Sequence, residues 1–258
     1  MADFRNSNVR VANGAQAGVA IDEGLRAYML RVYNIMAMGL GITGVAALVV
    51  AMYATTNDPA AAVATLGNGK MLTGLGAALY GSPLKWVVML APLAMVFFLS
   101  FRIEKMSVSA AQTTFWIYAA MMGVSLSSIF LVFTGSSITQ TFFVTAASFG
   151  ALSLYGYTTK KDLSGMGSFL IMGVFGLIIA MVVNIFLQSS ALEFAISAIG
   201  VLIFAGLTAY DTQQIKEMYY EGDADATAGR KAIMGALRLY LDFINLFMFM
   251  LQFLGNRE

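Results

Sequence analysis

The sequence predicts an all-α integral membrane protein with seven transmembrane helices. Hydrophobic residues make up 59% of the chain and charged residues 11%, whereas about a quarter of the residues in a soluble domain are charged. The mean hydropathy is +0.76. The apolar residues fall in runs of about 20, the length that a helix needs to cross a bilayer. A β-barrel is excluded because its strands alternate apolar and polar residues, which would not raise hydropathy this far.

The chain begins with a polar segment of mixed charge. It lacks the apolar stretch and small-residue cleavage site of a secretory signal. Apolar side chains recur at helical spacing toward its end, at Ile21, Leu25, Tyr28 and Met29. This spacing predicts an amphipathic lead-in, either lying on the cytoplasmic membrane surface or continuing into the first span. We therefore divide the chain into a cytoplasmic N-terminal segment, residues 1–30, and a seven-helix transmembrane domain, residues 31–258.

Seven apolar runs follow in order along the rest of the chain. They are residues 33–53, 85–101, 110–133, 137–157, 167–187, 192–214 and 233–254. The first connection, residues 55–84, is long and rich in Ala, Gly and Thr, and we expect a partly helical cap at the outer surface. The third and fourth runs are separated only by "TGSS", but their combined length requires two crossings.

The lysine and arginine residues predict the orientation of the bundle. With the N-terminus inside, eleven of them fall on the cytoplasmic side and three on the outer side. Because cytoplasmic loops of membrane proteins carry an excess of Lys and Arg, the N-terminus is expected inside and the C-terminus outside. This bias, the short connections and the absence of cysteine are typical of a multi-pass protein of the bacterial inner membrane.

Composition excludes several classes of function. The chain contains neither cysteine nor histidine, so disulfides, thiolate chemistry and the usual zinc and copper ligands are absent. No phosphate-binding loop, dinucleotide-binding fingerprint or hydrolase motif occurs. The net charge is +1, and the basic residues follow the topology, so nucleic-acid binding is not expected. We expect no cofactor and no enzymatic activity.

Two carboxylates lie within the last two spans. Asp242 interrupts "LYLDFINLFMFML", and Asp211 lies near the inner end of the sixth span in "GLTAYDTQQIKEM". A charged residue inside a membrane is costly and marks a candidate functional site. Because the two spans are consecutive and antiparallel, we expect the two side chains to meet at similar depth.

Two carboxylates in a low-dielectric site cannot both ionise easily, so the pair would share a proton and hold the two spans together. Loss of that proton leaves two like charges, which repel, recruit an arginine or accept a divalent cation. Calcium takes about six to eight oxygen ligands. Asp211 and Asp242 would therefore bind it weakly, with water, carbonyl groups, Asn245, Thr212 or Gln213 completing the site.

Other charged residues are candidate partners of this pair. Arg238 precedes Asp242 by one helical turn, so a simple ion pair within one helix is the structural alternative. Arg102 ends the second span on the same side of the membrane. At the outer ends of the fifth and sixth spans stand Asn184, Gln188 and Glu193. Glu193 either draws cations to an outer mouth or is a solvated loop residue.

Three segments resemble the Bax inhibitor-1 family, also called the transmembrane Bax inhibitor motif family. They are "GYTTKKDLSGMGSFL", "NIFLQSSALEFAISAIGVLIFAGLTAYDTQQIK" and "LRLYLDFINLFMFMLQFLG". The resemblance implies a central last helix wrapped by the other six, and a pH-sensitive calcium leak. It also implies that a carboxylate pair on the sixth and seventh helices is the proton sensor and latch, at positions that match Asp211 and Asp242. A family arginine at the end of the second helix pairs with this latch, and Arg102 is its best match.

Three functions follow from these observations. The first is a calcium leak channel gated by Asp211 and Asp242, with Arg102 as exchangeable counter-ion. The second is an interaction protein that modulates a membrane-bound protease or stress-response partner, because some bacterial family members resemble such regulators, although these lack the aspartate pair. The third, an intramembrane aspartyl protease, is disfavoured because neither aspartate has the glycine neighbour that such enzymes need.

Overall fold

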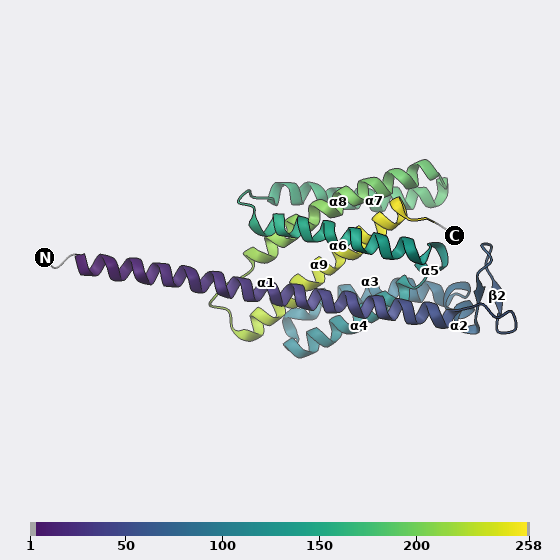
Figure 1. Ribbon diagram of the computed structural model, residues 1–258, viewed down its shortest axis with the longest axis horizontal. Helices are drawn as coiled ribbons and strands as arrows, with labels where there is room; N and C mark the ends of the chain where they lie inside the picture. Colours follow the sequence, from purple (N-terminus) through teal and green to yellow (C-terminus); the bar gives the residue numbers. More distant parts are fainter. Residues whose placement is uncertain (1–3, 257–258) are drawn as a thin grey trace.

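The computed structural model describes the backbone of residues 4–256 and the side chains from residue 23 to 256. Within this part of the chain, seven helices are long and apolar enough to cross a membrane, so the predicted seven-span, all-α fold is confirmed. They run side by side as a bundle (Figure 1). The seven are α1 (Phe4–Ala54), α3 (Leu84–Arg102), α4 (Val108–Leu126), α6 (Gly135–Thr158), α7 (Ser164–Leu187), α8 (Ser190–Glu217) and α9 (Asp225–Leu254). The predicted orientation of the termini stays a prediction.

Helix α1 is continuous across the predicted boundary at residue 30, and it extends well beyond the bundle at one end (Figure 1). The side chain of Ile21 lies outside the described residues. Further along, Tyr28 and Met29 are buried in the bundle core, where the Tyr28 ring lies 5.6 Å from that of Tyr219. This part of the lead-in is therefore an extension of the first span that packs on the bundle, and the division into two domains stays a prediction.

The long first connection contains a small sheet that the sequence analysis missed. Its antiparallel strands are β1 (Thr55–Thr56), β2 (Ala64–Thr65) and β3 (Met71–Leu72), in the order β1-β3-β2. The expected helical part is confined to α2 (Gly74–Gly76) and the π-helical turn η1 (Ala77–Gly81). Strands of two residues are too short to show the alternation by which strands are recognised. The Asn68–Gly69 dipeptide, with Gly69 at φ +85°, is the one readable hairpin signal.

The cap is fastened to one end of the bundle by α5 (Ile129–Val132), a short helix that follows α4. The side-chain amide of Asn68 donates to the Leu131 carbonyl at 2.8 Å, and the Lys70 ammonium donates to the Phe130 carbonyl. The turn between β2 and β3 is thus held against α5.

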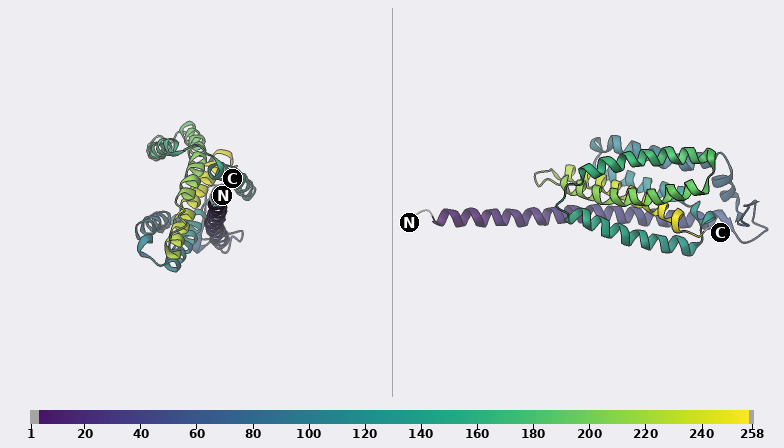
Figure 2. Two further views of the ribbon diagram at one scale, coloured as in Figure 1. Left: turned by 90° about the vertical axis from the view of Figure 1, so that its left-hand side faces the viewer. Right: turned by 90° about the horizontal axis from the view of Figure 1, so that it is seen from above.

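Helix α9 is the centre of the bundle, as the family resemblance implied. It packs against α1, α4, α6 and α8, and 67% of its apolar window is buried, compared with 11% for α7. Helices α3 and α7 form an outer layer, since α3 packs mainly on α4 and α7 on α8. Figure 2 shows α9 running through the middle of the bundle in the end-on view.

Buried hydroxyl groups join helices that are far apart in the sequence. The hydroxyls of Tyr240 and Thr43 lie 2.6 Å apart, and Thr43 also donates to the Ala119 carbonyl at 2.9 Å, which links α9, α1 and α4. A second chain runs from Tyr33 through Ser153 to Thr212, with distances of 2.7 and 2.9 Å, and links α1, α6 and α8. Interhelical hydrogen bonds of this kind contribute about 0.6 kcal/mol each in membranes.

Gln213 holds the connection between α6 and α7 in place. Its side chain is 5% exposed; the amide donates to the Lys161 carbonyl and the side-chain oxygen accepts from the Leu163 N–H, both at 2.8 Å. We expect Gln213→Ala to lower the free energy of unfolding by about 1–3 kcal/mol, because two backbone groups lose their partner. Thermal unfolding in detergent measures this loss.

The neighbouring residue supplies a matched control. The Gln214 amide makes an exposed contact with Glu217 at 3.2 Å, so Gln214→Ala should change stability by no more than about 0.5 kcal/mol. Equal losses of stability in the two variants would contradict the role assigned to Gln213.

Candidate functional site

The two intramembrane aspartates meet at the α8–α9 interface. Their carboxyl groups lie close enough to interact with each other. Asp242 is 5% exposed, and Asp211 is partly buried, six residues, or about 9 Å, before the end of α8. Two ionised carboxylates can only accept hydrogen bonds, so these two groups can bond to each other only when one of them is protonated. The structure therefore brings together the pair that the sequence analysis singled out.

The local sequence of α8 explains how Asp211 reaches this interface. Thr208, Asp211 and Thr212 are spaced by three and one residues, so they share one side of the helix. The Thr208 and Thr212 hydroxyls donate to carbonyls of their own helix, at 2.8 and 2.7 Å. Both threonines are buried without needing a partner on α9, which leaves the carboxyl group as the polar contact across the interface.

Asp242 retains an oxygen without a partner. Among the described residues, its Oδ2 atom is buried and accepts no hydrogen bond. Leu239, Phe243 and Leu246 around it on α9 are buried apolar residues. A buried acceptor without a donor costs about 1–3 kcal/mol.

Arg238 is the cation whose charge acts on both carboxyl groups. It stands one turn before Asp242 on α9 and is exposed. Arg102 is exposed in the last turn of α3. The structure thus groups Arg238 with the pair and does not place Arg102 beside it. The role of Arg102 as exchangeable counter-ion stays a prediction.

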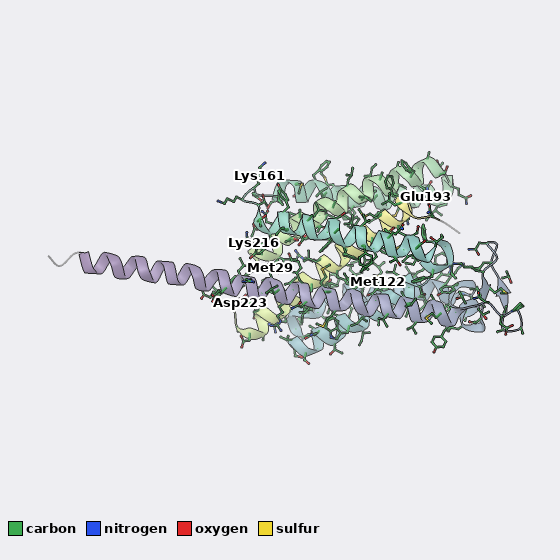
Figure 3. All side chains as sticks on the ribbon, viewed as in Figure 1. Met29, Met122, Lys161, Glu193, Lys216 and Asp223 are labelled. Carbon is green, nitrogen blue, oxygen red and sulfur yellow. The ribbon has the colours of Figure 1, made fainter. Side chains whose placement is uncertain are left out.

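Asn245 and Glu193 were the other candidate residues. The Asn245 amide donates to the Leu241 carbonyl of its own helix at 2.9 Å, one turn beyond Asp242. Glu193 lies at the opposite end of the bundle from Lys216 and Asp223, as Figure 3 shows. It lines a cavity with Asn184 and Gln188, the two residues with which the sequence analysis grouped it.

The candidate calcium site contains few strong ligands. No group of three or more His, Cys, Asp or Glu side chains suitable for a metal occurs among the described residues. Asp211 and Asp242 contribute two carboxyl groups, whereas calcium takes about six to eight oxygen ligands. Any cation held by these residues would depend on water and carbonyl groups, which makes the site suited to weak and transient binding.

A salt bridge closes the connection between α8 and α9. Lys231 contacts Asp223 at 2.5 Å and donates to the Met218 carbonyl at 3.0 Å. Neither this clamp nor the Tyr33–Ser153–Thr212 chain was predicted from the sequence. The eight-residue spacing of Asp223 and Lys231 spans a loop, for which no helical periodicity predicts a contact.

Comparison with known proteins decides the family. The family model described as "Inhibitor of apoptosis-promoting Bax1" matches residues 25–258. The chain belongs to the Bax inhibitor-1 family. The resemblance seen in the sequence is thereby confirmed, and the match includes all seven spans.

Bacterial relatives are similar over nearly the whole chain. A Rickettsia prowazekii protein described as uncharacterized is 48% identical over 92% of this chain and 92% of its own length. A Caulobacter vibrioides protein described in the same way is 46% identical over 100% of both chains. The inner membrane protein YbhL of Escherichia coli is 45% identical over 91% of this chain and 94% of its own. This Bax inhibitor-1 family member is accordingly a multi-pass protein of the bacterial inner membrane.

Proposed function

We propose that this Bax inhibitor-1 family member is a proton-gated leak channel for calcium ions, latched by Asp211 and Asp242. The observation that carries the proposal is the approach of the two carboxyl groups on consecutive helices, close enough for one to donate to the other when it is protonated. A bond that exists only while a proton is shared makes the contact between α8 and α9 depend on pH. Without histidine in the chain, no other side chain offers an unperturbed titration near neutrality.

The sign of the pH dependence follows from the charges. With one proton the pair bonds α8 to α9 and the pathway is closed. Without it, two unit charges about 4 Å apart repel by about 4 kcal/mol at an effective dielectric constant near 20. Such a repulsion exceeds several interhelical hydrogen bonds of about 0.6 kcal/mol. We therefore expect the closed state to lose its advantage, and calcium flux to rise, as pH is raised and the shared proton is lost.

Calcium is the ion that suits these residues best. The pair supplies hard carboxylate oxygens, which calcium prefers, and Asp242 Oδ2 has no other described partner. Two carboxyl groups bind calcium weakly, and weak binding allows an ion to leave a pathway as well as to enter it. Arg238 can balance the pair when no cation is present.

Calcium flux from vesicles with the purified full-length protein tests this function. We expect flux above that of protein-free vesicles, rising as pH is raised. Asp162→Asn is the matched control, because Asp162 is an exposed carboxylate outside the spans, where hydrogen bonds from Ser164 lower the pKa of its carboxyl group. This variant should keep the wild-type pH profile. Flux equal to that of protein-free vesicles at every pH would refute the leak and favour the alternative, modulation of a membrane-bound protease or stress-response partner.

A further inference from the structure

A groove lies between α1 and α6, at the end of the bundle where Met29, Lys216 and Asp223 are found (Figure 3). We call it the α1–α6 groove; its volume is about 550 Å³, which is in the range of about 300–1,000 Å³ that ligand sites have. Its lining residues are Arg26, Met29, Leu30 and Tyr33 of α1, and Phe149, Gly150, Ser153, Leu154 and Tyr157 of α6. On each helix these residues recur every three or four positions, so they share one face. The groove therefore runs lengthwise between two membrane spans.

The middle of the groove is apolar and opens sideways. Met29 and Phe149 are buried at its floor, whereas Leu30 and Leu154 are exposed at its rim. Gly150 leaves the groove wide, because an added Cβ there would meet no atom within 4 Å. Since both helices are spans, the open side of the groove faces the lipid bilayer.

The polar groups in the middle of the groove already have partners within the protein. The hydroxyls of Tyr33 and Ser153 lie 2.7 Å apart, and the Ser153 hydroxyl lies 2.9 Å from that of Thr212 on α8. The groove walls thus need no polar ligand to satisfy them. A hydrocarbon chain is the kind of group that fits between them.

Positive charge is concentrated at one end of the groove. Arg26 lies seven residues, or about 10 Å, before Tyr33, in the first turn of the span that begins at Glu23. At the same end the Lys216 ammonium donates to the Tyr157 carbonyl at 2.8 Å, and an ammonium has further N–H groups to offer. No Asp or Glu is among the described residues that line the groove. This end therefore suits an anionic group at the depth where lipid headgroups begin.

We propose that the α1–α6 groove is a binding site for an anionic phospholipid, with an acyl chain between Leu30 and Leu154 and the phosphate at Arg26, beside Lys216. An uncharged apolar ligand would leave the arginine without a counter-charge, and a water-soluble anion would leave the apolar groove unfilled. The charge bias predicts that this end of the bundle is cytoplasmic, where anionic lipids give the leaflet a negative surface potential. The site does not depend on the proposed calcium leak.

Native mass spectrometry of the purified full-length protein, freed of lipid in detergent, tests the headgroup contact. Phosphatidylglycerol and phosphatidylcholine with the same acyl chains are the two probes. Wild type should bind phosphatidylglycerol at least about fivefold more tightly, which corresponds to about 1 kcal/mol, the contribution of one basic residue. Arg26→Gln should bind the two lipids equally. Lys105→Gln is the matched control, because it removes an exposed cation outside the groove and should keep the preference.

A second substitution tests the acyl-chain contact without disturbing the bundle. Leucine at Gly150 would occupy the open space of the groove, so Gly150→Leu should weaken binding of both lipids at least about tenfold. Its melting temperature in lipid-free detergent should stay at or above that of wild type, which separates loss of the site from misfolding. Gly165→Leu is the control, because Gly165 of α7 also has open space around its Cβ position but does not line the groove.

Four results would overturn the lipid site. They are a preference for phosphatidylglycerol that survives in Arg26→Gln or is lost equally in Lys105→Gln, wild-type binding by Gly150→Leu, displacement of the lipid by an equal concentration of soluble glycerol phosphate, and a lipid-free dimer that Gly150→Leu dissociates. The third would indicate a site for the phosphate group alone. The fourth would show that a second copy of the chain fills the groove.

Discussion

Replacement of Asp242 by asparagine should abolish the pH dependence of calcium flux and keep the rate near its closed-state value. Asparagine has the shape of the protonated side chain and can donate a hydrogen bond to Asp211, but it has no proton to lose in this range. The bond between α8 and α9 then persists at every pH. The increase in calcium flux between low and high pH should be at least about tenfold smaller than in wild type. Removing about 1.4 kcal/mol of repulsion is enough for a tenfold change. Flux assays in vesicles measure it.

The same assay contains its own controls. Asp211→Asn should behave as Asp242→Asn does, and the double variant should add little, because groups that act as one unit are not additive. Asp162→Asn should retain the wild-type profile. If both single asparagine variants in the pair respond to pH as wild type does, the pair is not the gate.

Replacement of Gly156 by leucine should prevent α6 from packing on α8 and destabilise the whole bundle. An added Cβ at Gly156 would overlap the backbone carbonyl of Ala209, two residues before Asp211. Backbone cannot move aside as a flexible side chain can, so the helices must separate. We expect a loss of at least about 3 kcal/mol, at the upper end of the range for overpacked interiors. The yield of monodisperse protein and its melting temperature in detergent report the loss.

Another glycine of the same helix provides the comparison. Gly150 has open space where its Cβ would be, so Gly150→Leu should be neutral or should stabilise α6 by up to about 1 kcal/mol through better helix propensity. Similar losses in the two variants would show that the close approach of α6 and α8 at Gly156 is not what holds them together.

The spans and the aspartate pair could be predicted because each depends on a pattern that is visible along the sequence, without knowledge of how the helices pack. The length of the apolar runs predicts the helices. Because the last two spans are consecutive and antiparallel, Asp211 and Asp242 are expected to meet. The sheet in the first connection could not be predicted, since its strands have two residues each. The Tyr33–Ser153–Thr212 chain joins three helices, and only their packing in space reveals it.

The sequence alone does not show which arginine lies nearest the aspartate pair. The family resemblance gave Arg102 as the counter-ion, a role that stays a prediction, and Arg238 on α9 is the arginine whose charge bears on both carboxyl groups. The one-turn spacing of Arg238 and Asp242 is visible in the sequence, whereas the distance of Arg102 from the pair depends on how α3 packs.

Infrared difference spectroscopy of the purified protein tests the shared proton most directly. If Asp211 and Asp242 share a proton, wild type shows a protonated carboxyl band that disappears with rising pH over the range in which calcium flux increases. That band should be missing from Asp242→Asn and Asp211→Asn and unchanged in Asp162→Asn. A wild-type protein without such a band, or a band that survives in both asparagine variants of the pair, would contradict the shared proton and with it the proposed gate.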